Sequence, residues 1–376
     1  MYNDDFLQSN LKERKEQNAF RTLRLPENKI DFCSNDYLGI ARLGENLSDA
    51  YLQLTTYNLQ LSSGSAGSRL LAGNYPLIEE TEKQIASFHQ AEAGLIFNSG
   101  YDANLGLLSC VPQRGDTIIY DFLSHASIRD GIRLSQAQSF SFLHNDLNDL
   151  ERRLKAAMGN IFVVTESVFS MDGDYCPLPE IVALCKQYHA HLILDEAHAT
   201  GVVGERGEGL AQHLQLHDNL FARVHTFGKA CGCHGAVVLG SNSLRDYLIN
   251  FARSFIYSTA LPPATIQVVA NSYALFPTMN KEREHLNTLI DYFQSAIIAY
   301  PKLVSTTPIQ VVIVSGNTDV KRVAELLQSN NLDVRPILYP TVPKGSERLR
   351  IVLHSFNTIE DVELLVGLLA LQDRVF

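Results

Sequence analysis

Short apolar runs that end on polar residues recur through the first two thirds of the chain. These runs are GLIF (94–97), TIIYD (117–121), IFVVTE (161–166), HLILD (191–195), VHTF (224–227) and GAVVLG (235–240). Their length is typical of buried strands rather than of helices. The stretches between them are long enough for crossover helices, and strands joined in this way lie parallel. The pattern predicts an α/β fold with a mostly parallel sheet that has helices on both faces.

The pattern changes after residue 260. Residues 264–300 predict a helix, and the remaining chain alternates short strands and helices. Its apolar runs are IQVVIV (309–314), DVRPIL (333–338) and RLRIVL (348–353), with a polar helix over 318–329 and a last helix from about residue 358. We therefore expect three parts, which are an N-terminal arm (1–45), a large domain (46–280) and a small α+β domain (281–376).

Composition and charge argue against several classes of protein. The 376 residues carry 31 Lys and Arg against 41 Asp and Glu, and the formal net charge of -10 disfavours binding to nucleic acid. No apolar run approaches the roughly 20 residues that cross a bilayer, and the N-terminus lacks the apolar segment of a secretory signal. The six cysteines show no framework spacing. We therefore expect reduced thiols, a cytoplasmic location and no membrane partner.

The densest chemical signal lies in residues 191–240. The HLILD run ends on Asp195, His198 follows three residues later, and Lys229 lies in the exit loop of the next run. Ligands of open α/β sheets bind beyond the carboxyl ends of the strands, so these side chains are expected to converge on one crevice. A lysine and an acid in this arrangement are consistent with a Schiff base to a carbonyl cofactor whose pyridine nitrogen the acid keeps protonated.

The letters DEAH (195–198) also occur as the metal-binding motif of nucleic-acid helicases. That interpretation needs a phosphate-binding loop of the form GxxxxGK[ST]. The chain has none, because Arg223 stands at the required glycine position and Ala230 follows the lysine. A CxCH cluster (231–234) is also a weak metal signal without a second ligand pair, and we expect no metal.

Three stretches carry a resemblance to a known family. DEAHATGVVG (195–204), HTFGKACGCHGAVVLGS (225–241) and RSFIYSTALPP (253–263) resemble the α-oxoamine synthases. These are pyridoxal-phosphate (PLP) enzymes with the fold of aspartate aminotransferase. The resemblance extends from SNDYLG (34–39) to PTVPKGSERLRI (340–351) and therefore covers nearly the whole chain. It supplies the cofactor, which composition and periodicity do not indicate.

The resemblance assigns roles around the cofactor. Lys229 would form the Schiff base and later move the Cα proton of the substrate, while Asp195 would face the pyridine nitrogen. His198 is expected near the ring hydroxyl, and His125 of DFLSHAS (121–127) is expected to stack flat on the ring. The other residues implied are Gly100, Tyr101 and Thr226 for the phosphate, Glu166 and Ser170 beside the cofactor, and Ser258 and Thr259 from the second subunit of a homodimer.

The resemblance also implies substrate-binding residues. Asn35 of SNDYLG would reach the substrate carboxylate across a dimer interface, and Arg350 would grip that carboxylate through two parallel hydrogen bonds. Arg21 falls where one branch of the family has an arginine near the substrate, and a solvated charge on the arm is an equal alternative. Arg348 shares a strand face with Arg350, and we interpret it as a solvated residue at a sheet edge.

The activity implied is a PLP-dependent condensation of an amino acid with an acyl thioester and loss of carbon dioxide. SNDYLG, the compact N-terminus and the PTVPKGSERLR block favour the branch that joins L-alanine to a pimeloyl thioester in biotin biosynthesis, carried on coenzyme A or on an acyl carrier protein. The nearest rival is a glycine acetyltransferase that makes 2-amino-3-oxobutyrate, followed by a sphingoid-base or aminolevulinate synthase. Other classes are an aminotransferase or lyase of the same fold and a non-catalytic cofactor-binding protein.

Overall fold

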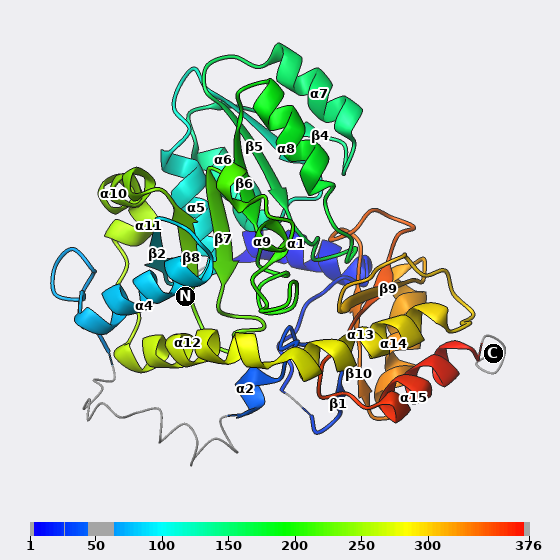
Figure 1. Cartoon of the computed structure of the whole chain (residues 1–376). Coiled ribbons are helices and arrows are strands. Elements are labelled where there is room, and N and C mark those ends of the chain that lie inside the picture. Colours follow the sequence, from blue (N-terminus) through cyan, green and yellow to red (C-terminus); the bar gives the residue numbers. More distant parts are fainter. Residues whose placement is uncertain (1–3, 26, 44–63, 372–376) are drawn as a thin grey trace. The chain divides into compact units, whose positions relative to one another are not determined.

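The computed structural model of the protein describes residues 4–25, 27–43 and 64–371. The chain divides into two compact units (Figure 1). The larger unit consists of Asp36–Ser170 and Tyr175–Arg283, and the smaller of Met1–Asn35, Met171–Asp174 and Glu284–Phe376. The boundary expected between residues 45 and 46 lies outside the described residues. The division of the chain at residues 45 and 280 therefore stays a prediction.

The larger unit is built on a seven-stranded sheet in the order β2-β8-β7-β6-β5-β3-β4. Strands β3 to β7 pair in parallel, and β8 runs antiparallel to both of its neighbours. The expectation of a mostly parallel sheet is therefore confirmed. The strands are β2 (Ala93–Phe97), β3 (Thr117–Asp121), β4 (Gln138–Phe142), β5 (Ile161–Glu166), β6 (His191–Asp195), β7 (Ala222–Thr226) and β8 (Ala236–Gly240).

Helices of the larger unit pack on this sheet through apolar side chains. One continuous core joins α5, α6, α10 and α11 to one face of the sheet. Alternate strand residues such as Val163 and Leu192 point to the other face and are also buried. The helices are α2 (Ile40–Leu43), α4 (Pro76–Phe88), α5 (Gly100–Cys110), α6 (Ala126–Leu134), α7 (Leu147–Ala156), α8 (Leu178–Gln187), α9 (Leu210–His213), α10 (Asn242–Phe251), α11 (Arg253–Ile256) and α12 (Pro263–Leu275), with a 3-10 turn η1 (His217–Asn219).

One strand of the sheet has no counterpart among the predicted strands. Strand β4 pairs in parallel with β3 at the edge of the sheet. Of its five residues only Phe142 is buried, and the first three are exposed. An edge strand packs little apolar surface, so the sequence QSFSF gives no apolar run from which to predict it.

The helix expected over residues 264–300 is interrupted. Helix α12 ends at Leu275, a 3-10 turn η2 (Phe276–Thr278) follows, and α13 runs over Asn280–Ser295. Pro277 lies in the turn, and a proline lacks the N–H that an α-helix needs at an interior position. The prediction of one continuous helix is therefore wrong.

The smaller unit is an α+β body. Its three-stranded antiparallel sheet has the order β11-β12-β9, and a second pair joins β1 and β10 in parallel. The elements after residue 300, yellow to red in Figure 1, match the pattern expected there, and α1 and β1 come from the N-terminal part of the chain. These elements are α1 (Asp5–Glu16), β1 (Ile30–Asp31), β9 (Ile309–Ile313), α14 (Asn317–Ser329), β10 (Leu332–Asp333), β11 (Arg335–Ile337), β12 (Arg348–Val352) and α15 (Ile359–Leu369).

No helix in the described ranges is both long and apolar enough to cross a lipid bilayer.

Candidate active site

Three adjacent strands of the larger unit end on buried polar residues. Strand β5 ends at Glu166, β6 at Asp195 and β7 at Thr226, and each of these residues is at most 8% exposed. Glu166 and Asp195 are paired residues of the parallel strands β5 and β6, so both lie at the carboxyl ends of neighbouring strands. Polar groups gathered at the carboxyl ends of parallel strands are placed to act on one ligand.

Asp195 is oriented by a donor on each carboxylate oxygen. The backbone N–H of Ala197 donates to Oδ1 at 2.9 Å, and the side-chain amide of Asn104 donates to Oδ2 at 2.7 Å. Such hydrogen bonds stabilise a negative charge and fix the plane of the carboxylate. Asn104 is a residue that the sequence interpretation missed. The sequence could have indicated it only as a single amide in the apolar stretch that includes Leu107, and the structure shows that this amide is buried in α5.

Glu166 has the opposite character. Burial and the neighbouring charge of Asp195 raise the pKa of Glu166 to about 8, although the backbone N–H of His125 donates to its Oε1 at 2.6 Å. Two adjacent buried carboxyls resist a double negative charge. Glu166 therefore holds its proton more readily than an ordinary glutamate does.

His125 is the N-cap residue of α6 and lies just beyond the end of β3. Its Nδ1 accepts the backbone N–H of Ser127 at 3.2 Å and lies 2.8 Å from the hydroxyl oxygen of Ser127. Removal of the ring from water lowers the pKa of His125, and the positive charge of Lys229 acts in the same direction. The residue nevertheless keeps an exposed surface. A neutral imidazole with an accessible surface suits contact with a flat aromatic ligand.

His198 is buried and contacts a second residue that the sequence interpretation did not name. Its Nδ1 lies 2.6 Å from the hydroxyl oxygen of Tyr37, which is itself fully buried. Tyr37 belongs to the SNDYLG motif, in which the sequence interpretation assigned a role only to the asparagine. This contact engages Nδ1 of the His198 ring and helps to fix the orientation of the ring.

The N-terminus of α5 comes close to the end of β7. A methyl group placed on Gly100 would lie 3.4 Å from Oγ1 of Thr226, so a larger residue would crowd this approach. Ser99 caps the helix by accepting the N–H of Asp102, and the hydroxyl of Tyr101 donates to Asp130. N–H groups in the first helical turn lack partners within the helix and favour anions. This end of α5 is therefore suited to a phosphate.

Lys229 lies in a tight turn three residues beyond β7. The N–H of Gly232 donates to the carbonyl oxygen of Lys229 at 2.8 Å, and Gly232 adopts a φ of 64°. A Cβ at this glycine would collide with the backbone of Ala41, so the turn requires glycine. The half-buried Lys229 bears a charge that acts on both Glu166 and His125. The structure thus brings the expected lysine into the electrostatic environment of the carboxyl pair.

Three other expected residues lie on loops of the same unit. Ser170 is half-buried and lies four residues beyond the end of β5. Ser258 and Thr259 follow α11, and the carbonyl oxygen of Thr259 accepts a hydrogen bond from Asn98 at 2.8 Å. Their contact with a cofactor stays a prediction.

Two of the expected substrate-binding residues meet in the smaller unit. Nη2 of Arg350, on β12, donates to Oδ1 of Asn35 at 3.0 Å, and Arg350 is half-buried. Arg21 donates to the hydroxyl of Thr341 at 3.1 Å and is exposed. The structure brings Asn35 and Arg350 together, while Arg21 pairs with a different residue.

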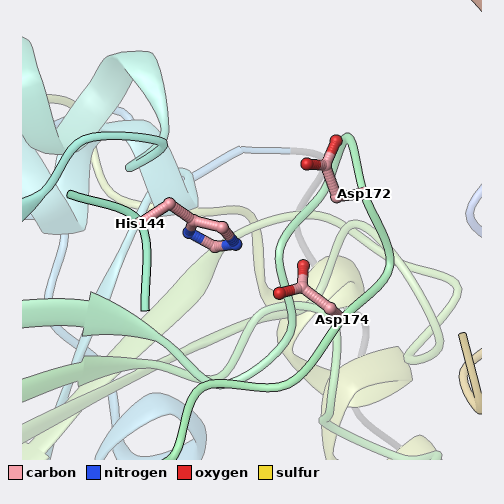
Figure 2. Close-up of side chains that lie close together, drawn as sticks. All are labelled: His144, Asp172 and Asp174. Carbon is pink, nitrogen blue, oxygen red and sulfur yellow. The ribbon is translucent and has the colours of Figure 1, made fainter. Parts of the chain in front are cut away.

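Arg348 does not match its expected state. Only 7% of it is exposed, and its guanidinium forms an ion pair with Asp172. Asp172 belongs to the loop Met171–Asp174, which Figure 2 shows with the side chains of Asp172 and Asp174. The carbonyl oxygen of Gly173 in this loop accepts the hydroxyl of Ser305 at 2.8 Å. The prediction of a solvated Arg348 is therefore wrong, because a loop distant in sequence covers that face of β12.

Comparisons with known proteins agree over nearly the whole chain. Residues 27–367 match the model of the aminotransferase class I and II family. The chain is 41% identical to 8-amino-7-oxononanoate synthase of Emericella nidulans, over 97% of this chain and 95% of that protein. Its structure is similar to serine palmitoyltransferase of Sphingomonas wittichii, with a TM-score of 0.86, 27% identity and coverage of 98% and 96% of the two chains. It is also similar to 8-amino-7-oxononanoate synthase of Francisella tularensis, with a TM-score of 0.76, 29% identity and coverage of 92% and 98%.

Proposed function

The chain belongs to the aminotransferase class I and II family, and from that premise we propose that it is a PLP-dependent acyltransferase of the α-oxoamine synthase group. It condenses L-alanine with a pimeloyl thioester and forms 8-amino-7-oxononanoate, carbon dioxide and the free thiol of the carrier. This reaction belongs to biotin biosynthesis. The near full-length similarity to 8-amino-7-oxononanoate synthases carries the choice of substrates.

The larger unit offers a suitable partner for each part of PLP. The N-terminus of α5 with Gly100, Tyr101 and Thr226 suits the phosphate, and charged Asp195 suits a protonated pyridine nitrogen. The remaining residues proposed to hold the cofactor are His198 at the ring hydroxyl, His125 on the ring face, Lys229 at the aldehyde carbon, and Glu166 and Ser170 beside them. When bound, the cofactor accepts the electron pair that is released at Cα of the amino acid.

The chain's own residues then move protons and orient the substrate. Lys229 removes the Cα proton of alanine and returns a proton after carbon dioxide has left. Asp195 keeps a negative charge beside the pyridine nitrogen, where it stabilises the protonated ring. Protonated Glu166 adds no second negative charge next to Asp195 near neutral pH.

Substrate binding is assigned to the smaller unit. We propose that Arg350 grips the carboxylate of alanine through two parallel hydrogen bonds and that Asn35, its hydrogen-bond partner, steadies the guanidinium. Arg21 is proposed to contact the substrate as well. A planar guanidinium fits a carboxylate in a geometry that a lysine cannot reproduce.

A homodimer with shared active sites is part of the proposal. In it, Ser258 and Thr259 of one subunit complete the phosphate site of the other. All six cysteines are thiols in the structure, which supports a location in the cytoplasm. The carrier of the acyl group is either coenzyme A or an acyl carrier protein.

The purified protein tests this function with a panel of substrate pairs. L-alanine with pimeloyl-coenzyme A or pimeloyl-acyl carrier protein should release free thiol and give 8-amino-7-oxononanoate by mass spectrometry. Glycine with acetyl-coenzyme A tests the glycine acetyltransferase alternative, and alanine with a 2-oxo acid tests an aminotransferase. Lys229→Ala is the matched control for chemistry without the lysine. Turnover of either rival pair in preference to alanine and the pimeloyl thioester would overturn the proposal.

A further inference from the structure

A continuous hydrogen-bond chain joins Asp195 to His125 inside the larger unit. Asn104, which is 2% exposed, donates from Nδ2 to Oδ2 of Asp195 at 2.7 Å and to the hydroxyl oxygen of Ser127 at 3.0 Å. Ser127 is also buried, and its hydroxyl lies 2.8 Å from Nδ1 of His125. This series of hydrogen bonds thus connects the end of β6 through α5 to the start of α6.

The donor and the acceptor of each hydrogen bond in this series follow from the chemistry of Asp195 at one end and His125 at the other. An ionised carboxylate only accepts hydrogen bonds, so the amide of Asn104 must present its nitrogen to Asp195. The same nitrogen supplies its second hydrogen to Ser127. Nδ1 of His125 accepts the backbone N–H of Ser127, so this nitrogen carries no proton and the Ser127 hydroxyl donates to it as well. His125 is therefore neutral with its proton on Nε2.

Close packing of two helices sets Asn104 in position. A Cβ on Gly131 of α6 would lie 2.8 Å from the backbone oxygen of Asn104 and 3.0 Å from Cβ of Leu108. Only glycine allows α5 and α6 to approach this closely. The approach places the Asn104 amide within reach of both Ser127 and Asp195.

We propose that Asn104 is a positioning residue that keeps the negative charge on Asp195 rather than on Glu166 and, through Ser127, fixes His125 as the Nε2–H tautomer. Among the described residues, Asp195 receives two donors and Glu166 one, so the second donor decides which carboxyl of the adjacent pair is ionised. One residue thereby sets both the charge at the pyridine nitrogen and the protonation of the ring-stacking histidine. This inference rests on the cofactor site of the proposed function.

The first test measures PLP affinity by equilibrium dialysis of the full-length holoenzyme. Asn104→Asp keeps the shape of the side chain but replaces the donor by an acid, and the PLP dissociation constant at pH 7 should rise about ten- to a hundredfold. Lowering the pH to about 5.5 protonates part of the introduced acid. This should restore part of the affinity relative to Asn104→Leu, which has no donor at any pH. A residue that only fills space would give no such difference between the two variants.

The matched control lies at the other end of the same strands, where β3 and β5 begin. Asn160, just before β5, donates from Nδ2 to Oδ1 of Asp116 at 3.0 Å, so Asn160→Asp removes an equivalent donor far along the strand from Glu166. Its PLP dissociation constant should equal that of the unchanged protein. Equal effects of Asn104→Asp and Asn160→Asp, or unchanged affinity in Asn104→Asp, would overturn the inference.

A second test needs no substitution at Asn104. Nitrogen NMR of histidine-labelled holoenzyme reads the tautomer of each of the 12 histidines, and His125→Gln assigns the signal of His125. We expect the Nε2–H form, and Ser127→Ala should raise the pKa of His125 because the neutral ring loses a donor. Asp195, Lys229 and Asp130, whose charges act on His125, are unchanged in that variant. An Nδ1–H signal would contradict the inference. Neither test requires acyl transfer, so a protein that passes both and forms no 8-amino-7-oxononanoate would refute only the proposed function.

Discussion

The two units use charged side chains in different ways. In the larger unit, Asp195 and Glu166 are buried at the ends of parallel strands, and hydrogen bonds from Asn104 and backbone groups determine which of them is charged. In the smaller unit, Arg350 is half-buried on an antiparallel strand and contacts the uncharged side chain of Asn35. The first arrangement fixes a charge before any ligand arrives. The second holds a half-buried guanidinium beside an amide, which suits recognition more than catalysis.

The largest effect should come from removing the lysine of the larger unit. Lys229→Ala should lower the rate of product formation by about a hundred- to ten-thousandfold, because a positioned proton-transfer group is lost. Borohydride reduction followed by peptide mass spectrometry should place PLP on Lys229 in the unchanged protein and on no residue in the variant. A reduced adduct on another lysine would show that the assignment is wrong.

Removal of the negative charge of Asp195 should have the next largest effect. Asp195→Asn retains the shape of the side chain but removes the negative charge, and the rate should fall about a hundred- to a thousandfold. PLP should also bind more weakly in equilibrium dialysis. Full turnover by this variant would remove the basis for treating the strand-end carboxylate as catalytic.

The smaller unit offers two arginines on one strand, Arg350 and Arg348, whose substitutions can be compared directly. Arg350→Lys should raise the alanine concentration for half-maximal rate about tenfold or more, because a paired hydrogen-bond geometry is lost, while PLP stays bound. Arg348→Lys should leave the alanine requirement unchanged and lower the melting temperature, because its partly buried ion pair with Asp172 is weakened. Steady-state kinetics and thermal melting separate the two outcomes. An equal rise in the alanine requirement would mean that neither arginine is specific for the carboxylate.

The last effect concerns Glu166 and is a dependence of stability, rather than of rate, on pH. Its pKa in the folded protein, about 8, lies above the ordinary glutamate value, so the folded state holds its proton more tightly. The stabilisation that results is complete below about pH 4.5 and is lost as the pH rises toward 8. Glu166→Gln mimics the protonated form and should melt at a higher temperature than the unchanged protein at pH 8, with the difference vanishing near pH 4.5. A pH-independent difference would place the pKa elsewhere.

The sequence predicts most strands of the central sheet because they are apolar runs, and the polar residues at or just beyond the ends of these runs are candidates for the site. Asp195 and Lys229 could be named for that reason. The edge strand β4 gave no signal because it buries only Phe142. The burial of Arg348 depends on a loop more than 170 residues away in sequence, which strand alternation cannot reveal. Asn104 and Tyr37 act through other side chains, and such contacts exist only once the fold has brought their partners together.

The most direct test of the central claim follows the carboxyl carbon of alanine. Purified protein is incubated with carboxyl-labelled L-alanine and a pimeloyl thioester, and labelled carbon dioxide and free thiol are measured together. The account predicts one carbon dioxide released for each thiol, with no label retained in 8-amino-7-oxononanoate. In a parallel incubation that also contains a 2-oxo acid as amino acceptor, labelled pyruvate without carbon dioxide would instead identify an aminotransferase and contradict the account.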